Sequence, residues 1–145
     1  MKALIQRVSQ ASVTIDKKIN GSIKNGLLIF ICFEENDNLE KMNTMVHKIV
    51  NLRIFEDEKQ KMNQNLLQSG GSLLSISQFT LSWDGKKGHR PSFDKSMPPN
   101  QAKILYRNFN DALSATGINI EKGQFGADMK VQSINDGPVT FFLDY

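Results

Sequence analysis

Cysteine and histidine are scarce in this sequence of 145 residues, which contains one cysteine, Cys32, and two histidines, His47 and His89. A single cysteine excludes an intrachain disulfide, and no cysteine and histidine cluster has the spacing of a zinc site. Neither histidine has an obvious nucleophile and carboxylate partner in the sequence, so a catalytic triad is not indicated. Because Cys32 lies in the apolar run of residues 27–33, we expect a small buried residue rather than a nucleophile.

Long apolar runs and phosphate-binding loops are absent as well. The longest apolar stretch, residues 27–33, is far shorter than the roughly 20 residues of a membrane-spanning helix. Polar side chains interrupt residues 1–7 too early for a secretory signal, and the Gly-Lys-Lys-Gly of residues 85–88 lacks the Walker pattern. We therefore expect a cytoplasmic protein without membrane attachment, and neither a metal enzyme nor a nucleotide hydrolase.

The composition is that of one ordinary folded domain spanning residues 1–145. Apolar residues make up 39% and charged residues 23% of the chain, which is typical of globular proteins. The net charge is +3, from 18 basic and 15 acidic side chains. This mild excess permits an anionic partner without demanding one, so any contact with nucleic acid should be local.

Hydrophobic periodicity predicts short strands and two helices. Asp37 begins the first helix, with Glu40 completing a box-like cap, and Pro98 and Pro99 open the second. The apolar face of the second helix includes Leu105, Phe109 and Leu113. Residues 53–69 are expected to be irregular or a loose hairpin. The expected strands cover residues 1–15, 19–23, 27–33 and 73–81, with two or three more in the last 28 residues, the final pair separated by Gly137-Pro138. Because no β-α-β alternation is apparent, the pattern predicts a single α+β domain with a mostly antiparallel, barrel-like sheet.

Three polar segments are candidates for function. In the expected strand, alternation places Ser77 on one face and Gln78 and Thr80 on the other, although such hydroxyls also pair across ordinary sheets. The Gly137-Pro138 pair is either a simple turn or a cis bond whose neighbouring carbonyls grip an ammonium group. The loop of residues 83–93 mixes cations with aromatic residues, as a solvated loop would, or a loop that contacts phosphates and stacks on a base. Its candidate phosphate contacts are Lys86, Lys87 and Arg90.

Two of these segments carry a family resemblance. The sequence Ser77-Gln78-Phe79-Thr80-Leu81 resembles the first signature of the D-aminoacyl-tRNA deacylases, also called D-tyrosyl-tRNA deacylases, and residues 135–140 resemble the second. Residues 3–13, 90–93 and 125–129 are also similar to segments of this family, and the resemblance runs from residue 1 to residue 145.

The resemblance implies a homodimeric hydrolase that uses no metal or organic cofactor. Gly137-Pro138 would be cis and would reach into the active site of the partner subunit, where it rejects L-amino acids, and Arg7 would support its geometry. The catalytic pocket would be lined by four consecutive residues, Ser77, Gln78, Phe79 and Thr80. The implied substrate is D-aminoacyl-tRNA, bound at its 3′-terminal adenosine.

Proximity and an oxyanion site would suffice for catalysis, because the aminoacyl ester is already activated. The backbone N–H groups of Phe79 and Thr80 are the candidate oxyanion donors. We favour attack by water, assisted by the 2′-hydroxyl of the terminal adenosine, over covalent catalysis through Thr80, since no base is evident for that hydroxyl.

Selectivity would follow from a collision between an L side chain and the Gly137-Pro138 backbone. Glycine has no side chain to collide, so glycyl-tRNA, including glycine mischarged on tRNA-Ala, should also be cleaved. Two alternatives stay open: a β-rich domain that binds structured RNA without catalysis, and an inactive structural dimer. Loss of only the D form from paired D- and L-tyrosyl-tRNA samples would favour the enzyme.

Overall fold

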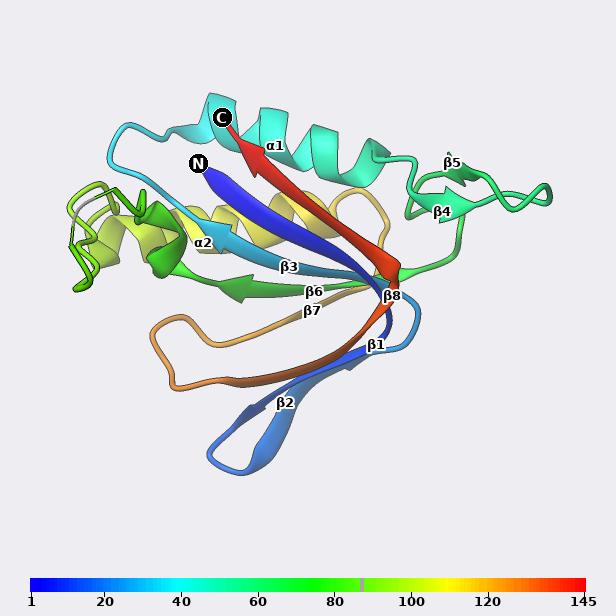
Figure 1. The fold of residues 1–145 in the computed structure, drawn as a ribbon, viewed down its shortest axis with the longest axis horizontal. Coiled ribbons are helices and arrows are strands. Elements are labelled where there is room, and N and C mark those ends of the chain that lie inside the picture. Colours follow the sequence, from blue (N-terminus) through cyan, green and yellow to red (C-terminus); the bar gives the residue numbers. More distant parts are fainter. Residues whose placement is uncertain (87) are drawn as a thin grey trace.

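The first strand, β1 (Lys2–Ile15), organises the sheet because three other strands pair with it, all antiparallel. Its first half pairs with β3 (Gly26–Cys32), its second half with β2 (Lys18–Ile23), and both halves with β8 (Lys130–Asp144). The computed structural model, which describes residues 1–86 and 88–145, is drawn as a ribbon in Figure 1. These spans confirm the strands predicted in the first 33 residues.

Beyond β3 the sheet continues with parallel strands. β6 (Ser72–Ser77) pairs parallel with β3, and β7 (Ile120–Lys122) pairs parallel with β6. The two helices make these pairings possible, because α1 (Leu39–Asn51) connects β3 to β6 and α2 (Pro99–Ser114) connects β6 to β7. The predicted lack of β-α-β alternation was therefore wrong. The sheet is mixed, and only the half around β1 is antiparallel.

This mixed sheet curls until its two edges approach each other, which gives the α+β domain a nearly closed, barrel-like shape (Figure 1). The side-chain amide of Asn20 in β2 donates a 2.8 Å hydrogen bond to the backbone carbonyl of Lys122 in β7. The barrel-like architecture with two helices is thus confirmed.

Two cores on opposite faces of the sheet explain why β3 is apolar throughout. Leu27, Ile29 and Ile31 belong to the larger core, which α1 and α2 cover. Leu28 and Leu74 point the other way, into the smaller core inside the curled sheet. Because successive side chains of a strand face opposite sides, a strand between two cores must be apolar at every position.

The first helix begins one residue later than predicted. The side chain of Asn38 caps α1 by accepting a 3.0 Å hydrogen bond from the backbone N–H of Lys41. Asp37 instead accepts a 2.7 Å bond from the backbone N–H of Glu34 and lies 2.9 Å from the amino group of Met1. The Asp37 carboxylate is therefore occupied by Met1 and Glu34 instead of capping the helix.

A hairpin, the second helix and two C-terminal strands complete the domain. β4 (Phe55–Glu56) and β5 (Met62–Gln64) form the loose hairpin, and α2 starts at Pro99 as expected. The last 28 residues hold two strands, β7 and β8, but Gly137-Pro138 lies inside β8 rather than between strands. Neither helix of the described residues has the length and apolar character that crossing a membrane requires.

Candidate functional site

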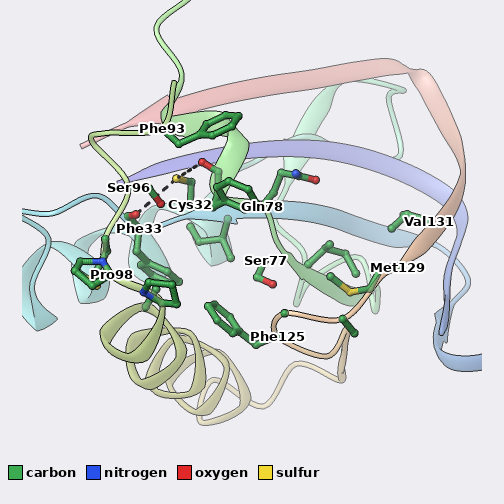
Figure 2. Close-up of a pocket in the computed structure, with 18 residues that line it drawn as sticks. Cys32, Phe33, Ser77, Gln78, Phe93, Ser96, Pro98, Phe125, Met129 and Val131 are labelled. Atoms are coloured by element: carbon green, nitrogen blue, oxygen red, sulfur yellow. Dashed lines mark hydrogen bonds between the residues drawn. The ribbon is translucent and has the colours of Figure 1, made fainter. Parts of the chain in front are cut away.

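A cavity of about 630 Å³ opens where the parallel strands β3 and β6 end (Figure 2). Ile31 of β3 pairs with Ser77 of β6 at this edge, and both residues line the cavity. The other walls come from Phe79 and from parts of residues 93–102 and 125–131. Figure 2 shows Phe93 and Phe125 on opposite sides of the cavity, with Ser77 between them. The carboxyl ends of parallel strands are a common place for ligand binding.

The first signature segment borders this cavity, but it is not the extended strand that the sequence predicted. β6 ends at Ser77, and Phe79–Ser82 form a 3₁₀ turn, η1. The backbone N–H of Gln78 still makes a bond to β3, donating to the carbonyl of Ile31 at 2.8 Å, and the 3₁₀ turn follows directly after it. Ser77, Gln78 and Phe79 line the cavity. The predicted alternation of faces therefore fails after Ser77.

Among the described residues, the first two backbone N–H groups of the turn have no acceptor. Leu81 N–H donates to the Gln78 carbonyl and Trp83 N–H to the Thr80 carbonyl, at 3.3 and 3.2 Å. Among the hydrogen bonds of residues 1–86 and 88–145, none has the N–H of Phe79 or Thr80 as its donor. These two groups are the oxyanion donors predicted from the sequence.

The carbonyl of Phe79 is held from two sides. The hydroxyl of Ser82 donates to it at 2.8 Å, and the thiol of Cys32 donates at 3.5 Å. Burial raises the pKa of the Cys32 thiol to about 11, so this donor keeps its proton at neutral pH. The Phe79 ring stacks edge-to-face on Phe93, with centroids 4.9 Å apart. These contacts fix the orientation of the turn.

The Thr80 hydroxyl lies beside the cavity rather than among its lining residues. Its oxygen accepts a 2.7 Å hydrogen bond from the side-chain amide of Gln78. Within the described part of the chain, no histidine or carboxylate accepts a hydrogen bond from this hydroxyl. A hydroxyl in this setting is a weak nucleophile.

The second signature segment forms a bulge in β8 opposite Arg7. Gln6 pairs with Thr140 and Val8 with Asn135, so four residues of β8 lie opposite the single residue Arg7. The Gly137-Pro138 peptide bond within this bulge is cis. Asn135 closes the bulge, because its side-chain oxygen accepts from Val139 N–H at 3.1 Å.

Arg7 is buried beneath the bulge and holds it to the rest of the domain. Its Nε donates to the backbone carbonyl of Asp136 and faces the Asp136 carboxylate, both at 3.3 Å. Its Nη1 donates to the backbone carbonyl of Ile54 at 2.8 Å. Arg7 therefore links the bulge to the backbone at Ile54.

The bulge does not meet the cavity of its own chain. Arg7 pairs with Leu27, whereas Ser77 pairs with Ile31, four residues further along β3. Four residues of a strand span roughly 13 Å. Neither Gly137 nor Pro138 lines the cavity. The structure thus places the two predicted halves of the site apart within one chain.

The predicted tRNA-binding loop leads directly into the cavity wall at Phe93. Lys86 and Arg90 are exposed, and Lys87 lies outside the described residues. Asp84 accepts a 3.1 Å bond from the backbone N–H of Lys86, and its carboxylate lies 3.3 Å from Lys95. The bond from Lys86 is the main reason that the pKa of Asp84 is lowered. The charge of Lys95 is partly neutralised by its ion pair with Asp84.

Several cavity residues were missed as site residues. Cys32 was interpreted only as buried, and Phe125 and Met129 were noted only as part of a resemblance. Cys32 ends β3, whereas Phe125 and Met129 lie between β7 and β8, and that these segments meet at one cavity becomes clear only once the strands are paired. Among the described residues, no group of three or more His, Cys, Asp or Glu side chains could hold a metal ion.

Comparison with known proteins gives consistent matches over the whole chain. A family model described as D-Tyr-tRNA(Tyr) deacylase matches residues 4–144. A D-aminoacyl-tRNA deacylase of Shewanella sp. (strain ANA-3) is 54% identical over 143 residues, covering 99% of this chain and 99% of the relative. A D-aminoacyl-tRNA deacylase of Geotalea daltonii is 51% identical over 144 residues, covering 99% of this chain and 96% of the relative.

Solved structures agree with these matches. A protein named c-Myc DNA Unwinding Element Binding Protein is 38% identical, with a TM-score of 0.95, covering 100% of this chain and 99% of that chain. A probable eukaryotic D-amino acid tRNA deacylase has the same fold at 17% identity, with a TM-score of 0.84, covering 99% of this chain and 98% of that chain. The family match and the full-length identities together show that this chain belongs to the D-aminoacyl-tRNA deacylase family.

Proposed function

We propose that the protein hydrolyses the ester between a D-amino acid and the 3′-terminal adenosine of tRNA, with the ester bound in the cavity beside residues 77–80. The activity, that of a D-aminoacyl-tRNA deacylase and hence a hydrolase, follows from family membership. The site assignment rests on one observation, that Ser77, Gln78 and Phe79 line a cavity of about 630 Å³. A cavity of that size suits a small organic ligand. The protein would act in the cytoplasm, where its substrate is found.

The oxyanion of the tetrahedral intermediate would be held by the backbone N–H groups of Phe79 and Thr80. Both groups lack an acceptor within the described chain, so they are available to a substrate. Backbone donors that are fixed before the reaction stabilise developing charge without reorganisation. The hydrogen bonds from Ser82 and Cys32 to the Phe79 carbonyl would keep them aligned.

The attacking group would be water, activated by the 2′-hydroxyl of the terminal adenosine. The Thr80 oxygen accepts from Gln78 and has no base beside it in the described residues. Covalent catalysis through Thr80 would need such a base. If the RNA assists the attack by water, the protein needs only to position the ester.

Gly137 and Pro138 would complete the cavity of a partner copy in a homodimer. In their own chain they lie away from the cavity, as their pairing opposite Arg7 requires. β8 also exposes large apolar side chains, Ile134 at 59%, Phe141 at 39% and Phe142 at 53%. An apolar surface of this kind is suited to cover by a second copy.

Rejection of L-aminoacyl-tRNA would result from the position of the Gly137-Pro138 backbone next to the bound amino acid. An L side chain would collide with that backbone, whereas a D side chain would point to solvent. Glycine would escape rejection because it has no side chain. The protein would therefore also cleave glycyl-tRNA, including glycine mischarged on tRNA-Ala.

The decisive experiment follows ester loss from D-tyrosyl-tRNA, L-tyrosyl-tRNA and glycyl-tRNA with the purified protein. We expect loss of the D and glycyl esters and retention of the L ester. Binding of all three without ester loss would support the alternative of an RNA-binding domain without catalysis. Retention of glycyl-tRNA at high enzyme concentration would count against rejection by steric collision alone.

Mixing two defective variants tests whether the bulge acts across a dimer. A Gln78→Ala chain keeps an intact bulge, and a Gly137→Ala chain keeps an intact cavity. A mixed dimer has one wholly native site only if each bulge serves the other chain. We expect the mixture to recover D-selective hydrolysis that neither variant shows alone. No recovery from a mixture that forms mixed dimers by ultracentrifugation would contradict the arrangement.

A further inference from the structure

The positive charge of the chain is concentrated beside the cavity. Residues 82–110, which include the tRNA-binding loop and most of α2, carry six basic and two acidic side chains. The other 116 residues carry 12 basic and 13 acidic side chains. The whole excess of positive charge therefore lies in the segment that supplies Phe93, Pro98 and Ala102 to the cavity wall.

Helix α2 extends this basic surface away from the cavity. Its first turn contributes Pro99 and Ala102 to the cavity wall. Lys103 follows directly, and Arg107 comes one turn later on the same side of the helix. Both side chains are exposed, and in the described part of the chain neither lies within 4.0 Å of a carboxylate. They differ in this from Lys95, which is paired with Asp84.

We propose that Lys103 and Arg107 bind backbone phosphates of the tRNA acceptor end as it leaves the cavity. The inference rests on the proposed function, because it assumes that the 3′-terminal adenosine occupies the cavity. Residues four apart on a helix are about 6 Å apart along its axis, so α2 presents two cations in a row from the cavity outward. Asn100 and Gln101, exposed in the first turn of α2, add hydrogen-bond donors for phosphate or ribose oxygens.

Lys86 and Arg90 would contact the RNA from the other side of the cavity wall. The loop that carries them joins the wall at Phe93, whereas α2 joins it at Pro99 and Ala102. The tRNA would then lie between two basic elements. Contacts with phosphates do not depend on sequence, so this surface would serve many tRNAs. It would affect binding of tRNA but not the chemistry in the cavity.

The test compares two substrates, D-tyrosyl-tRNA and the D-tyrosyl ester of adenosine, which has no acceptor stem. The protein tested carries the double charge reversal Lys103→Glu with Arg107→Glu. We expect its KM for D-tyrosyl-tRNA to rise by roughly tenfold or more, with kcat unchanged. The dependence of log kcat/KM on log salt should become shallower by about one for each cation removed. Hydrolysis of the adenosine ester should stay at the wild-type rate.

Matched controls separate a local contact from a change in net charge. Lys18→Glu with Lys24→Glu changes the charge equally at exposed positions of β2 and the β2–β3 turn, and should leave KM for tRNA near the wild-type value. A protein in which the two cations are exchanged, Lys103→Arg with Arg107→Lys, should keep most of the wild-type affinity for tRNA. An equal effect of both charge-reversed proteins on tRNA would overturn the proposal, as would no effect of either. If the wild-type protein cleaves neither substrate, the proposed function fails instead.

Discussion

The side-chain amide of Gln78 donates a 2.7 Å hydrogen bond to the hydroxyl oxygen of Thr80, two residues further along the chain. This bond makes the hydroxyl an acceptor, and no base lies on its other side in the described residues. We therefore expect Thr80→Ala to keep kcat for D-tyrosyl-tRNA within about threefold of the wild type, because a hydroxyl without a base is a weak nucleophile. Single-turnover kinetics at saturating enzyme measure the chemical step directly.

A tRNA that ends in 2′-deoxyadenosine provides the complementary test. If the ribose hydroxyl assists the attacking water, its removal should slow the wild-type enzyme far more than Thr80→Ala does. A loss of roughly 10³-fold or more in Thr80→Ala, with retention of activity in Thr80→Ser, would instead establish covalent catalysis.

Arg7 is 6% exposed and makes hydrogen bonds that a lysine cannot reproduce together. Its guanidinium reaches the backbone carbonyls of Asp136 and Ile54 at the same time. A lysine ammonium could reach only one of these two carbonyls, so the other carbonyl would lose its hydrogen-bond donor. We expect Arg7→Lys to lower the free energy of unfolding by about 2 kcal/mol, measured by urea denaturation.

One of the exposed ion-pair partners of Arg7, Glu56, offers the control. Glu56 lies 3.8 Å from Arg7 and its side chain is 55% exposed. Glu56→Gln should change stability by less than about 1 kcal/mol, as for other exposed ion pairs. Equal losses in the two substituted proteins would show that charge, and not the bridging hydrogen bonds, holds the bulge.

Local patterns were sufficient to predict the elements whose burial is regular. The apolar run of residues 27–33 gave β3, and the spacing of Leu105, Phe109 and Leu113 gave the buried face of α2. The side chains of β3 and α2 are buried in the pattern that a two-sided strand and an amphipathic helix predict. The parallel pairing of β6 with β3 was not predictable in this way, because it depends on which distant strands meet.

The signature segments pointed to residues that border the cavity, but the backbone geometry of these segments was not predicted. Ser77 to Thr80 alternate like a strand, yet the chain turns after Ser77, where β3 offers its last pairing residues. The four-residue bulge around Gly137 likewise depends on Arg7, which lies 130 residues earlier in the sequence. Both departures depend on where distant parts of the chain meet, β3 with β6 in one case and β1 with β8 in the other, which no local propensity encodes.

Gly137 occupies a position where any side chain would be crowded and strained. Its φ is +119°, and an added Cβ would lie 2.7 Å from Val139 Cγ2 and 3.0 Å from Arg7 Nη2. We expect Gly137→Ala to lower the free energy of unfolding by about 1–3 kcal/mol and to increase cleavage of L-tyrosyl-tRNA relative to D-tyrosyl-tRNA. Thermal denaturation and the paired tRNA substrates measure the two effects.

Gly70→Ala separates backbone strain from crowding. Gly70 has a φ of +67°, but an added Cβ would meet nothing within 4 Å. This substitution should cost about 1 kcal/mol and leave the discrimination between D and L substrates intact. Gly137→Ala would cease to be informative about selectivity if Gly70→Ala altered discrimination to the same extent.

The thiol of Cys32 should couple the stability of the domain to alkaline pH. It is 1% exposed and donates to the Phe79 carbonyl at 3.5 Å. Burial, followed by the nearby carboxylate of Glu34, raises its pKa to about 11, whereas an unfolded cysteine has a pKa of about 8.5. The folded state thus favours the protonated thiol. Its stabilising contribution is complete below the unfolded pKa and is lost as pH rises toward 11.

The comparison is between wild type and Cys32→Ala, each unfolded in urea between pH 7 and pH 10.5. Above pH 8.5 the stability of the wild type should fall more steeply than that of Cys32→Ala, the two slopes differing by at most about 1.4 kcal/mol per pH unit. A thiol reagent at pH 8 should also react slowly with the folded protein and rapidly in urea. Parallel pH profiles for the two proteins, or rapid labelling of the folded one, would show that Cys32 is neither shielded nor held as a neutral donor to the turn at Phe79.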